Sequence, residues 1–139
     1  MARFRPWPVT ALIAWTLFTW GNRIPLLWAS STQTHREKVL GTIPIAIFVV
    51  LAVVGAVAVL VSADVLVGWA RTAALVLAGW SIAYWLVRLP LILAHHHPIP
   101  FKAVHTVLAA VAIGLAVWAL RRIRTPAPTA APRPTPVDV

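Results

Sequence analysis

The sequence has no cysteine and very few acidic residues. Only three of its 139 residues are Asp or Glu. The lack of cysteine excludes disulfides, thiolate metal sites and thiol nucleophiles. Glu37, Asp64 and Asp138 lie outside the apolar stretches, so no pair of carboxylates is available for acid–base catalysis. Most classes of enzyme are excluded, and we expect a protein without catalytic residues or a cofactor.

Charge of either sign is also scarce, and hydrophobic residues dominate. Charged residues make up 11% of the chain and hydrophobic residues 60%. A soluble domain carries roughly a quarter of its residues as charged side chains. The charged residues that are present are mainly basic, with twelve Lys and Arg against three Asp and Glu. This composition predicts an integral membrane protein.

The hydrophobic residues form four stretches, at about 8–28, 40–61, 67–88 and 104–120. A helix that spans a bilayer needs about 20 mainly apolar residues. Continuous runs of this length, without alternation of polar and apolar residues, are typical of helices rather than barrel strands. We therefore predict an all-α fold, a four-helix transmembrane bundle over residues 1–124. Residues 125–139 are rich in proline and poor in core-forming residues, which predicts a disordered tail.

Four spans place both termini on the same side of the membrane. Seven basic residues fall on that side and five on the other, namely Arg3, Arg5, Arg71, Arg121, Arg122, Arg124 and Arg133 against Arg23, Arg36, Lys38, Arg88 and Lys102. This bias, with its basic cluster after the last span, favours the cytoplasm for the termini. We predict a multi-pass protein of the plasma membrane with its histidine-rich loop outside.

Two segments of the chain share an unusual pattern. Residues 15–27 and 80–92 both read W-[ST]-x-x-[TY]-W-x-x-R-[IL]-P-L, and a shift of 64 aligns Lys38 with Lys102. We predict a duplicated helix hairpin, with copies at about 5–61 and 70–120 in parallel orientation about an axis along the membrane normal. The alternative is chance, combined with the enrichment of Trp and Arg at membrane interfaces.

The repeated residues suggest a binding site for an anion. Within each copy the second Trp and the Arg lie three residues apart, on one helix face. A guanidinium group binds two oxygens of a phosphate or carboxylate together. The predicted site consists of Arg23, Arg88, Asn22, Trp20, Tyr84, Trp85, Lys38 and Lys102. The alternative is that the arginines reach the lipid headgroups and the tryptophans form an interfacial belt.

Five histidines, at positions 35, 95, 96, 97 and 105, lie on the predicted outer side. His95, His97 and His35 are the candidate metal ligands, since imidazole binds zinc and copper. Glu37 is the only acidic or thiolate ligand nearby, and the spacing matches no known zinc pattern. We therefore favour a solvated loop over a metal site.

The Arg-rich, Lys-poor, Ala- and Val-rich composition and the two Trp–Arg–Pro segments resemble uncharacterised small four-helix integral membrane proteins of high-GC Gram-positive bacteria. The resemblance covers residues 8–120 and implies no activity. We predict a non-enzymatic protein that binds an anionic lipid, a lipid-linked headgroup or a partner subunit through an outward Arg/Trp site. The alternative is a small transporter or channel subunit that is active as an oligomer. Nucleic acid is not expected as a partner, because the basic cluster lies so close to the bilayer.

Overall fold

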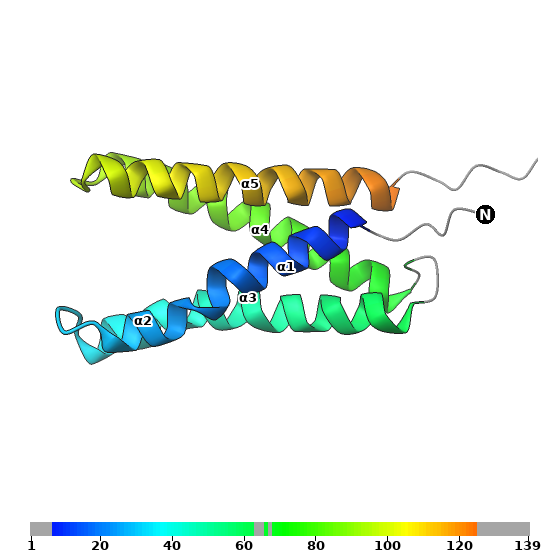
Figure 1. Cartoon of the computed structure of the whole chain (residues 1–139), viewed down its shortest axis with the longest axis horizontal. Helices are drawn as coiled ribbons and strands as arrows, with labels where there is room; N and C mark the ends of the chain where they lie inside the picture. Colours follow the sequence, from blue (N-terminus) through cyan, green and yellow to red (C-terminus); the bar gives the residue numbers. More distant parts are fainter. Residues whose placement is uncertain (1–6, 63–65, 67, 125–139) are drawn as a thin grey trace, which may run out of the picture.

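A computed structural model describes residues 7–62, 66 and 68–124, and the regular structure within them is entirely helical. The elements are α1 (Trp7–Gly21), α2 (Arg23–Ala29), α3 (His35–Val61), α4 (Trp69–Ala94) and α5 (Ile99–Arg124). Because α2 continues the path of α1, these segments form a four-helix bundle (Figure 1). The predicted all-α four-helix bundle is therefore confirmed. The predicted tail, 125–139, lies outside the described residues.

Three of the described helices, α3, α4 and α5, are 26 or 27 residues long and apolar enough to cross a membrane. The protein is thus a multi-pass membrane protein. The predicted first span, 8–28, is interrupted between Gly21 and Arg23, and α1 has only 15 residues. Since a complete crossing needs about 20 residues, a crossing by α1 and α2 together remains a prediction.

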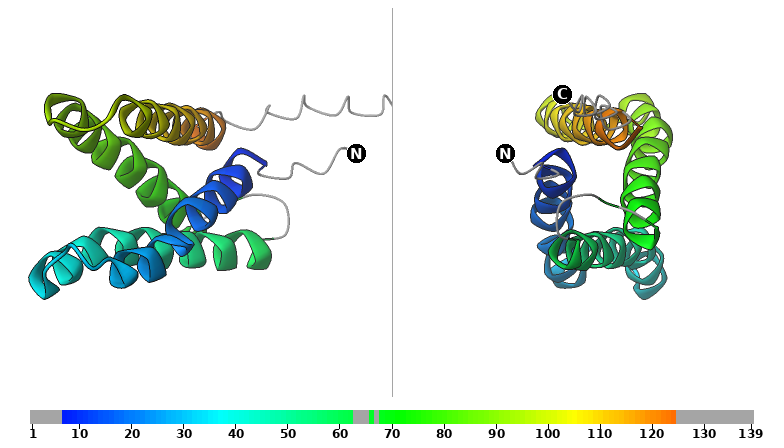
Figure 2. Two further views of the ribbon diagram at one scale, coloured as in Figure 1. Left: turned by 60° about the vertical axis from the view of Figure 1, so that its left-hand side comes forward. Right: turned by 90° about the vertical axis from the view of Figure 1, so that its right-hand side faces the viewer.

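The helices are arranged in a ring. α1 packs against α3 and α5, and α4 packs against the same two helices. Viewed end-on, α1 lies opposite α4, and α3 lies opposite α5 (Figure 2, right). The α2–α3 and α4–α5 connections lie at one end of the bundle, which we call the tip end (Figure 1). The start of α1 and the end of α5 lie at the other end, so the helices alternate in direction as predicted.

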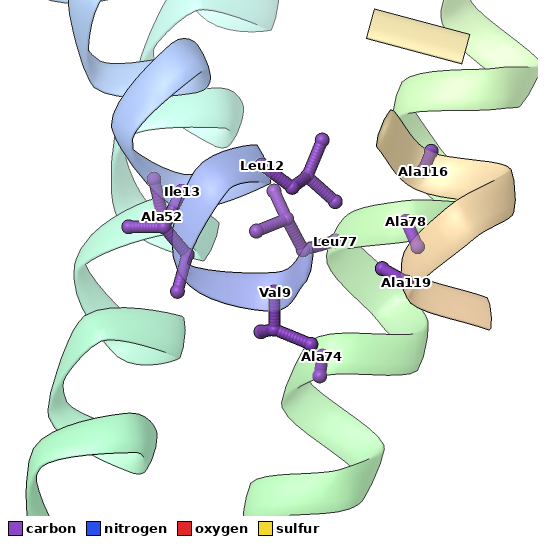
Figure 3. Packing of buried hydrophobic residues seen from close by; sticks show 9 residues of the cluster. All are labelled: Val9, Leu12, Ile13, Ala52, Ala74, Leu77, Ala78, Ala116 and Ala119. Carbon is purple, nitrogen blue, oxygen red and sulfur yellow. The ribbon is translucent and has the colours of Figure 1, made fainter. Parts of the chain in front are cut away.

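The core nearer the chain termini is built from alanines around a few branched side chains. Leu12 of α1 and Leu77 of α4 meet at its centre and are both fully buried (Figure 3). Small residues let transmembrane helices approach closely, because lipid provides no hydrophobic drive for their association. The cluster consists of Val9, Leu12, Ile13, Ala52, Ala74, Leu77, Ala78, Ala116 and Ala119.

The core nearer the tip end is aromatic. The ring of Trp20 stacks on Phe48 with 4.5 Å between centroids, and Tyr84 meets Trp20 edge-on at 5.3 Å. Trp85 completes the group, with its ring centroid 5.7 Å from that of Tyr84 and 6.2 Å from that of Trp20. Each such aromatic pair adds about 0.5–1.5 kcal/mol beyond the area it buries. This rigid cluster supports the polar residues at the tip end.

Candidate anion site at the tip end

The two predicted arginines lie around the same tyrosine. Arg23 and Arg88 both interact electrostatically with Tyr84. Trp20 and Trp85, which both contact Tyr84 edge-on, are only 6% and 2% exposed. The structure therefore brings together these five predicted site residues. The two tryptophans are core residues, and their burial leaves the polar side chains as the accessible part of the candidate site.

Arg23 is engaged by a histidine that lies 82 residues away in the sequence. Its Nη2 atom lies 3.1 Å from Nε2 of His105, on α5. Nδ1 of the same imidazole lies 2.8 Å from the carbonyl oxygen of Phe101. Because a guanidinium group can only donate, Nε2 must accept and Nδ1 must carry the hydrogen. His105 is therefore a neutral imidazole in this arrangement, and it links α5 to the start of α2.

Arg88 has a different environment. Its side chain is exposed, and none of the described residues forms a hydrogen bond or an ion pair with it. It lines an open hollow of about 250 Å³ together with Leu91, Ile92, His95 and His97. Nδ1 of His95 donates to the carbonyl oxygen of Leu91 at 2.7 Å, which leaves its Nε2 for another partner. The hollow thus combines one fixed positive charge with two imidazoles.

The predicted lysines bind the backbone instead of lining the hollow. Nζ of Lys38 donates to the carbonyl oxygen of Trp28 at 3.0 Å, and Nζ of Lys102 donates to that of Leu93 at 2.7 Å. Each acceptor lies in the last turn of the preceding helix, where carbonyls lack partners and a positive charge is favourable. Both lysines therefore stabilise a hairpin connection. Asn22 is exposed and makes no capping hydrogen bond to α2.

The candidate metal ligands do not come together. His35 packs edge-on against Trp28, with 5.7 Å between ring centroids, at the tip of the first hairpin. His95 and His97 lie at the tip of the second, which Figure 1 shows apart from the first. The described residues contain no group of three His, Cys, Asp or Glu side chains suited to a metal ion. Since Arg88 lines the hollow beside His95 and His97, its charge favours an anion there over a cation.

Sequence reasoning missed the role of His105. It lies in the second turn of α5, and no local spacing relates it to Arg23. Only the packing of α1 against α5, together with the helix break that places Arg23 at the start of α2, brings the two together. The one available signal was that a polar side chain within an apolar segment is expensive and needs a partner.

No known protein family, curated protein or solved structure matches this chain. The resemblance to small four-helix integral membrane proteins is supported only for the architecture, a small four-helix protein with three helices long and apolar enough to span a membrane. No family is identified. Its function must therefore be argued from its own residues.

Proposed function

We propose that this protein is a non-enzymatic membrane protein that binds a phosphate-bearing anionic headgroup at its tip end. The observation that carries the proposal is Arg88, an exposed arginine with no hydrogen bond or ion pair among the described residues, in a hollow shared with His95 and His97. The planar guanidinium group donates to two phosphate oxygens at once, and the imidazole of His97 can donate to a third.

The surroundings of Arg88 favour an anion that is attached to a lipid. Arg88 lies within α4, a candidate membrane span, and Leu91 and Ile92 form apolar walls of the same hollow. A charged residue within a membrane span is expensive and is commonly functional. A headgroup carried by an apolar chain satisfies both features, since its charge meets Arg88 while the chain stays in the bilayer. Free phosphate offers only the first contact.

The proposal includes the duplication of the hairpin, which matching hydrogen bonds support. Thr16 and Ser81, 65 residues apart, are both buried, and each donates to the carbonyl oxygen four residues earlier, at 2.7 and 2.8 Å. The acceptors of Lys38 and Lys102, the carbonyls of residues 28 and 93, are also 65 residues apart. A shared local pattern in both halves is what two copies of one ancestral hairpin retain.

The buried positions match in the same way. A shift of 65 residues relates buried positions of α1 (Val9, Leu12, Ile13, Thr16 and Trp20) to those of α4 (Ala74, Leu77, Ala78, Ser81 and Trp85). A shift of 64 relates those of α3 (Ile45, Phe48, Ala52 and Gly55) to those of α5 (Ala109, Ala112, Ala116 and Ala119). A pseudo-two-fold axis along the bundle would place α1 opposite α4 and α3 opposite α5, the arrangement seen in Figure 2.

The duplication accounts for the unpaired state of Arg88. Arg23 corresponds to Arg88 and His105 corresponds to Gly41. Glycine provides no acceptor side chain, and the space next to it is filled by Leu27, whose Cδ2 lies 3.2 Å from where a Cβ would stand. We therefore propose that an external anion takes the place at Arg88 that an imidazole takes at Arg23.

The orientation of the protein belongs to the proposal as well. The last turn of α5 carries Arg121, Arg122 and Arg124, at the end of the bundle opposite the tips. Basic residues next to a span favour the cytoplasmic side. Both termini are then cytoplasmic, and the Arg88 hollow opens at the outer face of the plasma membrane. A reporter fused after Arg124 should read as cytoplasmic, and one inserted at His96 as external.

The proposal is tested by reconstituting the protein in nanodiscs that contain phosphatidylglycerol and phosphatidylcholine, and measuring which lipid native mass spectrometry retains. Arg88→Gln should lower retention of phosphatidylglycerol by about tenfold or more, because a charge-assisted hydrogen bond contributes about 1.5–3 kcal/mol. Arg71→Gln is the matched control, an exposed arginine at the other end of α4. Inorganic phosphate as a competitor distinguishes a free anion from a lipid. Equal retention by both variants and wild type would contradict the proposal.

A transporter or channel subunit remains the second candidate. The observation that favours it is a pair of buried polar atoms, Thr19 Oγ1 and Trp80 Nε1, which have no hydrogen-bond partner among the described residues. Such groups are usually paired and can mark a polar route. Anion flux into proteoliposomes that Thr19→Val abolishes would support this function. Lipid retention without flux would support the binding protein.

A further inference from the structure

The imidazole of His105 occupies the position of an anionic acceptor. Its Nε2 lone pair faces Arg23 Nη2 at 3.1 Å, as a phosphate or carboxylate oxygen would. The tautomer is set by the second hydrogen bond, from Nδ1 to Phe101. The contact therefore depends on a neutral imidazole, because only the neutral ring offers a lone pair at Nε2.

We infer that Arg23 and His105 form a second anion site, which the neutral imidazole closes and protonation of Nε2 opens. Protonation turns Nε2 from an acceptor into a donor, so that two N–H groups face each other across a 3.1 Å contact. The two positive charges then repel, unless an anion separates and bridges them. A tetrahedral oxyanion, such as sulfate, phosphate or a phosphate headgroup, accepts from both groups. Binding is thereby coupled to the uptake of a proton.

Among the residues that the structure describes, the ionisable groups around His105 include no acidic side chain. The group that bridges Arg23 and a protonated His105 must therefore be an anion from outside the protein. Arg23 from α2 contacts His105 directly, and the ionisable side chain that Arg23 acts on in turn is Tyr84 of α4. From its own hairpin, His97 packs on the same Phe101 ring as His105, and Lys102 is bonded to the carbonyl oxygen of Leu93. α1 has no ionisable residue, and those of α3 lie in its first turn. Glu37, which carries the one carboxylate side chain in the described part of the chain, is bonded to Thr34 at the other tip. No acidic side chain there takes the place of the ligand.

Neither Arg23 nor His105 lines the Arg88 hollow, so the second site can be tested after the first has been removed. We would measure binding of radiolabelled sulfate to the purified full-length chain by equilibrium dialysis, in an Arg88→Gln background that removes the first site. Sulfate keeps its charge over the range from about pH 8 to about pH 5, in which imidazole titrates. Affinity should rise by about tenfold per pH unit on lowering the pH, as long as His105 remains mostly neutral.

Two further variants identify the groups. His105→Ala removes the internal acceptor, so sulfate should bind at pH 8 and the pH dependence should disappear. His96→Ala is the matched control, an exposed histidine outside both sites, and should behave like its parent. Sulfate binding that does not change with pH in the Arg88→Gln parent would overturn the inference. An unchanged pH dependence in the His105→Ala protein would overturn it as well.

A measurement on the unmodified protein covers the case in which His105→Ala does not fold. Nitrogen-15 NMR of the imidazoles should show His105 with hydrogen on Nδ1 alone at about pH 8, and on both nitrogens with sulfate at about pH 5.5. A hydrogen on Nε2 at the higher pH would overturn the inference. So would an imidazole that remains neutral with sulfate at the lower pH. If Arg88→Gln leaves lipid retention unchanged, the proposed function is contradicted. That result does not bear on the site formed by Arg23 and His105.

Discussion

The two hairpins, α1–α2–α3 and α4–α5, bury corresponding positions but end differently at their tips. In the first, the helix breaks between Gly21 and Arg23. In the second, α4 continues through Pro90 to Ala94. Each copy of the motif has a proline two residues after its arginine, and that proline has no N–H for the carbonyl four residues earlier. The proline alone therefore does not break the helix.

The residues before the proline account for the difference. In the first copy they include Gly21 and Asn22, which are poor helix formers. In the second copy the corresponding residues are Leu86 and Val87, both apolar and exposed on a candidate membrane span. A lost hydrogen bond is tolerated where the rest of the helix is favourable. A break in the first copy places Arg23 at the start of α2, from which it reaches His105.

Comparing the two hairpins shows which positions could diverge between the two copies. Residues in the centre of the bundle pack against the other hairpin, so a change there disturbs both halves. The tips diverge in Figure 1, and side chains there have room to take different partners. Arg23 is therefore hydrogen-bonded to His105, while Arg88 lines an open hollow with His95 and His97.

The strongest test of the comparison uses the matched core leucines. Leu12→Ala and Leu77→Ala should each destabilise the bundle by about 2–5 kcal/mol, the usual cost of such a cavity. Both side chains are fully buried at equivalent places, so the two losses should be similar. Leu60→Ala, at a position that is 84% exposed, is the control and should change little. Unfolding in mixed micelles would measure this, and strongly unequal losses for the two leucines would argue against equivalent halves.

The next test makes the two tips alike. Gly41→His should provide Arg88 with an internal acceptor and lower retention of phosphatidylglycerol by about tenfold, or about 1.4 kcal/mol. A side chain at this position must displace Leu27, so Gly41→Ala serves as the steric control. Retention by the Ala variant should stay near wild type. Equal losses in both variants would attribute the effect to Leu27 and not to an acceptor at Arg88.

The smallest expected effect concerns the two lysines that bind helix ends. Lys38→Met and Lys102→Met should each lower the free energy of unfolding by about 0.3–1 kcal/mol, the usual contribution of a cation at a helix C-terminus. Neither should change lipid retention, because Nζ of each lysine is bonded to a backbone carbonyl. A clear fall in lipid retention for either variant would indicate that this lysine belongs to the binding site. The same mixed-micelle unfolding and native mass spectrometry serve here.

The sequence by itself determined the helices and the residues around which the site is built. An apolar stretch in a bilayer must satisfy its backbone hydrogen bonds internally, so length and composition are enough to predict helices such as α3 and α5. The repeated motif singled out Arg23 and Arg88, and both proved to lie around Tyr84. These features depend on scarce residue types and on local periodicity, which a sequence records directly.

Only the tertiary structure decided which partner each polar side chain has. That Arg23 meets His105, 82 residues away in the chain, depends on the packing of α1 against α5 and on the helix break before Arg23. That Lys38 turns back to the end of α2 depends on the path of the connection between the helices. Hydrogen bonds act over about 3 Å, and helical periodicity fixes only the direction in which a side chain leaves its own helix. The neighbouring helix determines which group the side chain contacts. This is why Arg23 is hydrogen-bonded to His105, whereas Arg88 has no hydrogen bond among the described residues.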